Sequence, residues 1–397
     1  MLKTLQRLSS KSLKAKRVLV RVDFNVPQDE KGRVTDATRL EESLPTIRFL
    51  VKNGARVILM SHLGRPTPGK FEKEFKLDPI AKVLSKLLKK PVKKLDVCIG
   101  DEVEKAIEKM KNCDVVLLEN TRFYAGEEKN DPKFAKALAS LGDLYVNDAF
   151  GTAHRAHAST AGIAAYLPAY AGLLLGKEIK ALSPLLKKTA RPLVMIVGGA
   201  KIDTKIGILK NFIKKADTFL IGGGLANTFL LAEGFDVAQS LCEKNKVEVA
   251  REIMLASEKK RNQIMLPQDV VVASEISDKA ATLDIPVEDV EGDMKILDLG
   301  KKALAAYVEV IKKAKTIIWN GPVGLYEKKP FERGTRVIAK AVAISKAKTI
   351  LGGGDTIDAI KKFGFKFSKF DHVSTGGGAM LEFLEGKELP GIAILKK

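Results

Sequence analysis

Short runs of continuously apolar residues alternate along the chain with longer segments whose apolar residues recur at helical spacing. The runs span residues 17–22, 56–60, 114–118, 144–146, 193–197, 218–221, 268–272, 316–319 and 348–351. Between them, segments such as residues 77–88 place leucine, isoleucine and alanine three or four positions apart. Strands that are apolar throughout and alternate with amphipathic helices predict parallel sheets covered by helices on both faces.

The chain has 397 residues, too many for one ordinary hydrophobic core. The two sets of strands therefore predict an α/β protein with two doubly wound domains. We expect the join around residues 167–186, where residues 172–185 form a helix that leads into the second domain. The apolar tail at residues 389–395 must pack against another part of the chain.

The formal net charge of +20 raises the question of an acidic partner. Divided at residue 170, each half carries a net charge of +10, so the chain has no basic tail or single basic block. With 6% aromatic residues and one tryptophan, it lacks the basic face with interleaved aromatic residues expected of a nucleic-acid-binding protein. A nucleic-acid-binding protein is the alternative suggested by charge alone, and we expect no such partner.

The cysteines and the lengths of the apolar runs indicate in which cellular compartment the protein works. Cys98, Cys113 and Cys242 form neither a disulfide framework nor a zinc-binding spacing, which favours reduced thiols in a cytoplasmic protein. No apolar run approaches the length of a membrane span, so we expect no membrane partner. Residues 1–16 are basic and polar, and we expect no secretory signal there.

Basic and polar residues follow all four predicted strands of the first half. They are Arg21, Asp23 and Asn25, then His62 and Arg65, then Arg122, then His154, Arg155 and His157, while Arg39 opens the first helix. Ligands of parallel sheets bind beyond the carboxyl ends of the strands, and guanidinium groups match carboxylate and phosphate oxygens. One such arginine is usually a surface residue, but four strand ends of the same chemistry predict an anion site. The histidines there are either catalytic bases or hydrogen-bond donors.

Glycine-rich turns follow the strands of the second half. They lie at residues 198–201, 222–224, 320–324, 352–356 and 374–379. Glycine allows backbone N–H groups to approach a phosphate, although a single glycine pair more often makes a tight turn. Five such turns in one domain favour a nucleotide site. The G-x-x-x-x-G-K-[ST] and G-x-G-x-x-G patterns are both absent, so the predicted site has another design.

Two further features of the second half suit a bound phosphate. Asp355, a carboxylate at a glycine turn, is the natural Mg²⁺ ligand, since Mg²⁺ takes one or two carboxylates together with phosphate oxygens. Its other possible role is the N-cap of the next helix, for which Thr356 is the better candidate. Lys201 and Lys205 share one face of a helix start, an arrangement that an anion would stabilise.

An anion-binding domain and a nucleotide-binding domain in one chain predict phosphoryl transfer. Kinases that act on hydroxyl groups position an acid to accept the hydroxyl proton. A carboxylate acceptor is already ionised at neutral pH and needs no general base. The arginines, lysines and glycine turns of this chain are suited to positioning and neutralising such a substrate.

Eight segments, in order along the chain, resemble the phosphoglycerate kinase family. They are RVDFNVP (21–27), SHLGRP (61–66), LLENTRF (117–123), NDAFGTAHRAH (147–157), GGAK (198–201), WNGPVG (319–324), GGGD (352–355) and STGGGA (374–379). The resemblance implies two Rossmann-like domains with parallel sheets, joined by a hinge with an open cleft between them. It implies a 3-phosphoglycerate-binding domain at residues 1–170 with the tail 389–397, and a nucleotide-binding domain at residues 171–388.

The resemblance also implies a reaction. A usually monomeric enzyme of glycolysis and gluconeogenesis would transfer a phosphoryl group reversibly between ATP and the carboxylate of 3-phosphoglycerate, giving ADP and 1,3-bisphosphoglycerate, with Mg²⁺. The substrate would be held by Arg21, Asp23, Asn25, Arg39, His62, Arg65, Arg122 and Arg155. The nucleotide would be held by Gly199, Lys201, Lys205, Gly223, Gly224, Gly300, Asn320, Pro322, Leu325, Glu327, Gly352, Gly353, Gly354, Asp355 and Thr356.

Individual roles follow from the same motifs. Asp355 would bind Mg²⁺ and Glu327 the ribose. The catalytic residues would be Arg39 and Lys205, which neutralise the transferring phosphoryl group, and Gly376, Gly377 and Gly378, which face it.

The sequence departs from the family pattern at three places. After GGAK the family usually has x-Ser-Asp-Lys, whereas this chain has Ile202-Asp203-Thr204-Lys205, which moves the acid by one position. The metal turn reads Asp355-Thr356-Ile357 instead of Asp-Ser-Ala and keeps the hydroxyl group. Residues 298–301 (DLGK) lack the proline commonly found after that glycine.

Two alternatives lie close to this function: a kinase for another carboxylate, and a nucleotide-binding regulatory protein that has lost turnover. The presence of Lys201, Lys205 and Asp355 argues against lost turnover.

Overall fold

The computed structural model describes residues 2–260 and 262–396, which form two compact units. Unit 1 comprises Met1–Lys180 with Glu388–Lys397, and unit 2 comprises Ala181–Lys387. The chain passes from one to the other within helix α7 (Leu173–Lys187), later than the sequence-based boundary at residue 170. The start of α7 belongs to unit 1 because the backbone N–H of Leu174 donates to Asp148 Oδ1 at 2.9 Å.

Unit 1 is built on a six-stranded sheet of parallel strands in the order β3-β4-β2-β1-β5-β6. The strands are β1 (Arg17–Arg21), β2 (Arg56–Met60), β3 (Val92–Lys94), β4 (Val115–Leu117), β5 (Leu144–Asn147) and β6 (Ala169–Ala171). All four predicted runs of the first half are strands of this sheet. The edge strands β3 and β6 were not predicted, because β3 (VKK) carries two lysines and β6 (AYA) has alanine and tyrosine instead of a run of large aliphatic residues.

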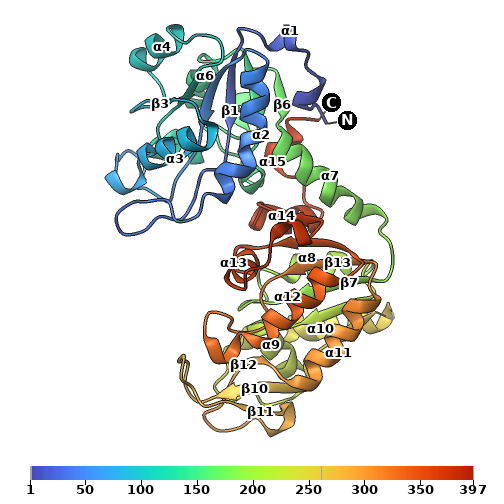
Figure 1. The fold of residues 1–397 in the computed structure, drawn as a ribbon. Helices are drawn as coiled ribbons and strands as arrows, with labels where there is room; N and C mark the ends of the chain where they lie inside the picture. The colour runs from blue at the N-terminus through green and yellow to red at the C-terminus, as the bar shows by residue number, and fades with distance from the viewer. Residues whose placement is uncertain (1, 261, 397) are drawn as a thin grey trace. The chain divides into compact units, whose positions relative to one another are not determined.

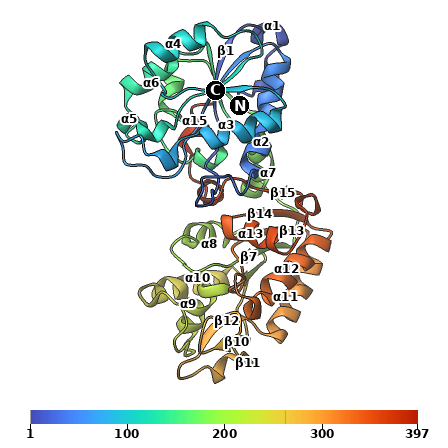
Figure 2. The ribbon, with the colours of Figure 1, turned by 60° about the vertical axis from the view of Figure 1, so that its left-hand side comes forward.

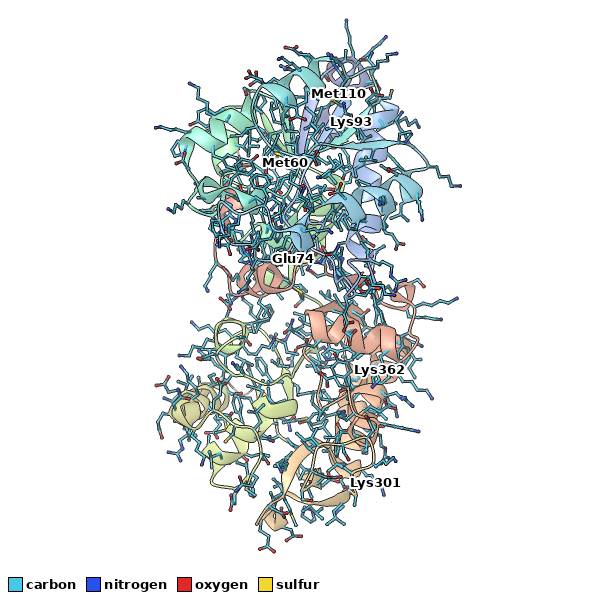
Figure 3. The ribbon with its side chains drawn as sticks, turned by 90° about the vertical axis from the view of Figure 1, so that its left-hand side faces the viewer. Met60, Glu74, Lys93, Met110, Lys301 and Lys362 are labelled. Atoms are coloured by element: carbon cyan, nitrogen blue, oxygen red, sulfur yellow. The ribbon has the colours of Figure 1, made fainter. Side chains whose placement is uncertain are left out.

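Helices cover this sheet (Figures 1 and 2). Those of unit 1 besides α7 are α1 (Ser10–Leu13), α2 (Thr38–Lys52), α3 (Asp78–Leu88), α4 (Asp101–Glu108), α5 (Ala125–Glu128), α6 (Pro132–Ala139) and α15 (Pro390–Ala393). The core packs the apolar faces of α2 and α3 against β1 and β2, with Ile47 and Leu84 fully buried. Met60, the last residue of β2, is also fully buried but is not part of this cluster; Figure 3 labels it within unit 1.

Unit 2 contains a second six-stranded parallel sheet, in the order β15-β14-β13-β7-β8-β9. Its strands are β7 (Leu193–Val197), β8 (Thr218–Ile221), β9 (Gln263–Met265), β13 (Thr316–Asn320), β14 (Lys348–Gly352) and β15 (His372–Val373). Its helices are α8 (Ile206–Phe212), α9 (Gly223–Glu233), α10 (Val247–Lys259), α11 (Lys301–Lys313), α12 (Arg333–Ile344), α13 (Gly354–Lys362) and α14 (Gly378–Leu384).

The helices of unit 2 lie on both faces of its parallel sheet. Figure 2 shows α11 and α12 side by side on one face and α8, α9 and α10 on the other. Lys301 and Lys362, at the ends of α11 and α13, project from the surface of this unit (Figure 3). With two parallel sheets covered by helices, the predicted α/β fold class is confirmed.

One predicted strand has the wrong partners. The run at residues 268–272 forms β10 (Asp269–Ala273), which belongs to a separate antiparallel sheet with β11 (Leu283–Pro286) and β12 (Lys295–Leu299). Val270 and Val272 are buried against Val290 within this small sheet. Burial there produces the same apolar run as burial in a parallel sheet, so the sequence pattern did not distinguish the two.

The C-terminal tail packs on unit 1. Gly391 accepts a hydrogen bond from Asn147 Nδ2 at 2.9 Å, and its own N–H donates to the carbonyl of Ala153 at 2.8 Å. In Figure 1 the red α15 lies beside the green elements of this unit. Across the described ranges 2–260 and 262–396, no helix combines the length and apolar character needed to traverse a bilayer.

Candidate active site

The residues predicted to bind an anion lie where the strands of unit 1 end. They follow β1, β2, β4 and β5 or open α2, and we call them the anion cluster: Arg21, Asp23, Asn25, Arg39, His62, Arg65, Arg122 and Arg155. The carboxyl ends of neighbouring parallel strands meet at one edge of the sheet, which brings together residues distant in sequence.

Asp23 joins two other members of the anion cluster. Its Oδ2 atom pairs with Arg39 Nη1, and its Oδ1 atom lies 4.0 Å from His62 Nδ1. Burial raises the pKa of the Asp23 carboxyl, but the charges of Arg39 and Arg21 and the hydrogen bond from the Asn25 N–H lower it more, so the pKa lies below its usual value. Asp23 is therefore ionised at neutral pH and fixes the Arg39 guanidinium, which keeps 35% of its side chain exposed.

Arg21 points into the protein and is 1% exposed. Its Nε donates to Ser159 Oγ at 2.8 Å, and its Nη1 donates to the carbonyl of Val22. Its Nη2 lies 3.2 Å from His62 Nδ1. Each nitrogen of the guanidinium thus has a partner within unit 1.

Asn25 and Arg122 hold the peptide groups around Gly64. The Gly64 N–H donates to Asn25 Oδ1 at 2.8 Å, and Arg122 Nη1 donates to the Gly64 carbonyl at 2.6 Å. Gly64 has φ of +60°, and a Cβ atom there would lie 2.3 Å from the Phe75 ring. The turn therefore requires glycine, and it presents the exposed Arg65 next to the buried Arg122.

Positive charge dominates the electrostatics of this edge. Burial lowers the pKa of His62 well below its usual value, and Arg21, Arg122 and Arg155 lower it further, against the opposing effect of Asp23. Burial also lowers the pKa of His157 to about 4, with the same three arginines acting in that direction and Glu127 opposing. Both histidines are therefore neutral at pH 7, and the arginines around them favour a bound anion.

Glu127 and Ser159 belong to this region but were missed by the sequence analysis. Glu127 is fully buried and accepts hydrogen bonds from the Ser159 N–H at 2.9 Å and the Ser159 hydroxyl at 2.5 Å. The only feature of the sequence that pointed to Ser159 was its position two residues after His157, in the basic segment that follows β5. Nothing in the sequence set Glu127 apart from its acidic neighbour Glu128.

In unit 2, several glycines of the strand ends contact one another through their backbones. A Cβ atom on Gly198 would lie 2.0 Å from the Pro322 carbonyl oxygen, and one on Gly321 would lie 2.2 Å from the Gly198 carbonyl oxygen. The Gly223 N–H donates to the Val323 carbonyl at 2.9 Å. These glycines allow the ends of β7, β8 and β13 to pack closely, as tight-turn glycines do.

The same strand ends surround a pocket of about 200 Å³. Seven residues predicted to bind the nucleotide line it: Gly199, Gly223, Gly224, Pro322, Leu325, Glu327 and Asp355. Leu241, Ile276 and Val323 add an apolar part. A pocket with apolar walls, backbone groups and three carboxyl side chains (Asp298, Glu327 and Asp355) has the composition of a small-molecule site.

The remaining predicted nucleotide residues lie outside the lining of this pocket. They are Lys201, Lys205, Gly300, Asn320, Gly352, Gly353, Gly354 and Thr356. Lys201 is exposed, and Gly300 packs on Asp269, whose Cγ would lie 2.3 Å from a Cβ on that glycine.

Lys205, Asn320 and Thr356 form a connected group at the ends of β13 and β14. Lys205 Nζ donates to Asn320 Oδ1, and Asn320 Nδ2 donates to the Gly352 carbonyl at 2.8 Å. The hydroxyl of Thr356 is buried and accepts from the Gly321 N–H at 2.7 Å. The predicted capping role of Thr356 is therefore wrong: the N-cap of α13 is Gly353, and the threonine hydroxyl instead holds the turn after β13.

Asp355 lies in the first turn of α13 with an exposed side chain. Among the residues that the structure describes, no three His, Cys, Asp or Glu side chains gather to hold a metal ion. A single accessible carboxylate at a helix start fits Mg²⁺ that arrives with phosphate oxygens and water. Asp203, the displaced acid, pairs with Lys246 Nζ at 2.8 Å and is thus engaged elsewhere.

The glycines after β15 leave open space. Gly377 has φ of +52°, and Cβ atoms built on Gly377 or Gly378 would meet no heavy atom within 4 Å. The Gly376 N–H donates to Ser374 Oγ at 3.1 Å, which fixes the turn. A ligand can therefore approach the backbone of this turn closely.

Comparisons with known proteins identify the family. The family model described as phosphoglycerate kinase matches residues 8–387. The chain is 54% identical over 395 residues to the phosphoglycerate kinase of Dictyoglomus turgidum, covering 99% of each chain. It resembles the structure of phosphoglycerate kinase from Coxiella burnetii, with 43% identity, a TM-score of 0.88, and coverage of 100% of this chain and 99% of that chain. The corresponding structure from Pyrococcus horikoshii gives 34% identity, a TM-score of 0.86, and coverage of 99% and 98%. The chain belongs to the phosphoglycerate kinase family.

Proposed function

We propose that the anion cluster of unit 1 binds 3-phosphoglycerate and that the glycine-rich strand ends of unit 2 bind Mg-ATP, as the two substrates of one phosphoryl transfer. The reaction follows from family membership: reversible transfer between ATP and the carboxylate of 3-phosphoglycerate, giving ADP and 1,3-bisphosphoglycerate, in glycolysis and gluconeogenesis. The assignment of residues to each substrate is our own.

For 3-phosphoglycerate, the observation that carries the proposal is the Asp23–Arg39–His62 group with Arg122 and Arg155 nearby. Asp23 fixes Arg39. His62 is neutral, and a neutral imidazole still has one N–H group that can donate a hydrogen bond to the substrate. Guanidinium groups match both anionic ends of the substrate, its phosphate and its carboxylate. Asn25 fixes the turn at Gly64 by accepting a hydrogen bond from its N–H, and this turn positions Arg65, the next residue, as a further cation.

For the nucleotide, the pocket lined by Gly199, Gly223 and Leu325 provides an apolar and backbone surface for the base. Glu327, which also lines the pocket, would bind the ribose hydroxyls. Asp355 would hold Mg²⁺, which when bound would neutralise phosphate charge. Lys205 and the backbone N–H groups around Gly353 would face the phosphates.

The chemical step needs no general base, because the attacking carboxylate is ionised at neutral pH. Arg39 and Lys205 would neutralise the charge on the three oxygens of the transferring group, and the backbone of Gly376–Gly378 would donate hydrogen bonds to it. The acyl-phosphate product hydrolyses readily, so water must be excluded during transfer. We infer that the two units close when both substrates are bound.

We also infer that the enzyme acts as a monomer in the cytoplasm. The compartment is supported by the three cysteines, all of which are free thiols, and the monomeric state rests on the family resemblance alone.

A coupled assay tests the function directly. Purified protein is given Mg-ATP and 3-phosphoglycerate, and NADH consumption by added glyceraldehyde-phosphate dehydrogenase reports 1,3-bisphosphoglycerate. We expect turnover that requires Mg²⁺ and 3-phosphoglycerate. Folded, nucleotide-binding protein that turns over another carboxylate but not 3-phosphoglycerate would overturn the substrate assignment.

A further inference from the structure

Arg21 was expected to touch the substrate, yet the residue is 1% exposed and each nitrogen of its guanidinium contacts the protein. We propose that Glu127, Ser159 and Arg21 form a buried relay that positions His62 as a hydrogen-bond donor toward 3-phosphoglycerate. All three are then positioning residues that act through His62, and this role rests on the function proposed above.

The relay begins at Glu127. This carboxylate is fully buried and accepts three hydrogen bonds, two from Ser159 and one from Thr121 Oγ1 at 3.3 Å. A buried carboxylate is costly unless it is hydrogen-bonded and lies near a compensating charge. All three of these donors are neutral, so the compensating charge comes from arginines that do not bond Glu127 directly: Arg122, which interacts with it electrostatically, and Arg21, one side chain further along through Ser159.

Ser159 gives the relay its direction. A hydroxyl group has one proton, and here it is donated to Glu127 Oε1 at 2.5 Å. The lone pairs of Oγ are thereby left to accept from Arg21 Nε at 2.8 Å. Hydrogen bonds in such a chain polarise one another, so the buried charge of Glu127 strengthens the hold on Arg21.

Arg21 then sets the protonation of His62. Arginine nitrogens only donate, so Nδ1 of His62 must accept the contact from Nη2 at 3.2 Å. A neutral imidazole with an accepting Nδ1 carries its proton on Nε2. Burial together with Arg21, Arg122 and Arg155 keeps His62 neutral at pH 7, against the pull of Asp23.

The Nε2 atom of His62 is free to use that proton. Within residues 2–260 and 262–396 it has no hydrogen-bond partner, and it is not among the buried polar atoms sealed without one. Through the relay, the buried carboxylate of Glu127 therefore fixes the Nε2–H group of His62 as a hydrogen-bond donor beside Asp23. A fixed donor loses little freedom when the substrate binds.

Steady-state kinetics with matched variants tests the relay. Glu127→Gln removes the charge, Ser159→Ala removes the link to Arg21, and each should raise the KM for 3-phosphoglycerate about tenfold. The KM for ATP should change less than about twofold. Tyr145→Phe is the control, since its hydroxyl donates to the Ser159 carbonyl at 2.9 Å but takes no part in the relay. It should lower the melting temperature without raising this KM.

NMR of the histidine rings reports the tautomer of His62, which would not change if Glu127, Ser159 and Arg21 only stabilised the fold. The chain has four histidines, and loss of a signal in His62→Gln assigns the ring of interest. In ¹⁵N-labelled protein at pH 7 we expect His62 to be neutral with its proton on Nε2, and to become a tautomer mixture in Arg21→Met.

Two results would overturn the relay: an unchanged KM for 3-phosphoglycerate in both Glu127→Gln and Ser159→Ala, or a His62 protonated on Nδ1. Failure of the function itself has a different signature. If the wild-type protein shows no turnover with 3-phosphoglycerate, the substrate assignment is wrong. The NMR spectrum of the His62 tautomer requires no substrate and still reports whether Arg21 controls His62.

Discussion

Lys205, at the start of α8, donates a hydrogen bond from Nζ to the side-chain oxygen of Asn320, at the end of β13. Burial lowers the pKa of the Lys205 ammonium to about 8, and the nearby Asp355 partly offsets this effect. The ammonium is thus held by a neutral amide and has no carboxylate partner within hydrogen-bond distance among the described residues. Its charge remains available to a phosphoryl group.

Lys205→Met should lower kcat by at least about 100-fold, the size of loss seen when one preorganised donor to a transition state is removed. The KM for 3-phosphoglycerate should change little, because Lys205 lies outside the anion cluster. Thermal stability should be kept, since methionine fills a similar volume and removes a half-buried charge. Steady-state kinetics in both substrates makes the comparison, and a loss confined to KM would remove Lys205 from the transition-state role.

Asp355→Asn should abolish the gain in ATP affinity that Mg²⁺ provides. Calorimetric titrations with ATP in Mg²⁺ and in EDTA measure this gain without requiring turnover. We expect wild-type protein to bind more tightly in Mg²⁺ and the variant to bind about equally in both. Asp358→Asn is the control on the same helix, because Asp358 accepts from the Tyr326 hydroxyl at 2.8 Å. An undiminished Mg²⁺ effect in Asp355→Asn would contradict the metal assignment.

Gly321→Ala should destabilise unit 2 by about 2 kcal/mol or more. Gly321 has φ of +95°, and its Cβ would lie 2.2 Å from the Gly198 carbonyl oxygen, a backbone atom that no rotamer change can move. Gly176→Ala is the opposite case: this glycine lies within α7, and a Cβ there meets no heavy atom within 4 Å. It should stabilise the protein by about 0.5–1 kcal/mol. Urea unfolding of both variants tests the contrast, and equal effects would contradict it.

Asp148 should make stability depend on pH. Burial raises the pKa of its carboxyl from 3.8 to about 7, against hydrogen bonds from Thr46, Leu175 and Leu174. The folded state binds this proton more tightly, so the contribution to stability is full below about pH 4 and is lost as pH rises through 7.

Asp148→Asn removes this titration while keeping an oxygen for the Leu174 N–H. The melting temperature of the variant relative to wild type should therefore be higher at pH 8 than at pH 5, by roughly 2–4 °C for each kcal/mol. Asp298, whose pKa burial also raises to about 7, titrates in both proteins and cancels in the comparison. A difference that does not change between the two pH values would refute the assignment.

Closure of the two units should be visible by small-angle X-ray scattering. We expect the radius of gyration to fall only when a nucleotide and 3-phosphoglycerate are both present, because each ligand alone is proposed to bind a single unit. Arg39→Ala should weaken the compaction, since Arg39 is proposed to meet the transferring group. An unchanged radius of gyration with both ligands would count against closure.

The sequence by itself determined the two parallel sheets and the family. Continuous apolar runs mark strands buried on both faces, and long motifs such as residues 147–157 are specific enough to identify a family that the comparisons then confirmed. It also located the strand ends that His62, Arg122 and Asp355 follow, and the carboxyl ends of parallel strands meet at one edge of a sheet.

Only the tertiary structure decided which of these residues touch one another. Glu127 and Ser159 are 32 residues apart, and Gly198 and Gly321 directly follow β7 and β13, which are neighbours in the sheet but not in the chain. Likewise, the antiparallel partners of β10 and the inward turn of Arg21 leave no periodic signal. Pairing between distant segments is set by strand order and core packing, whereas a sequence pattern records only whether each position is buried.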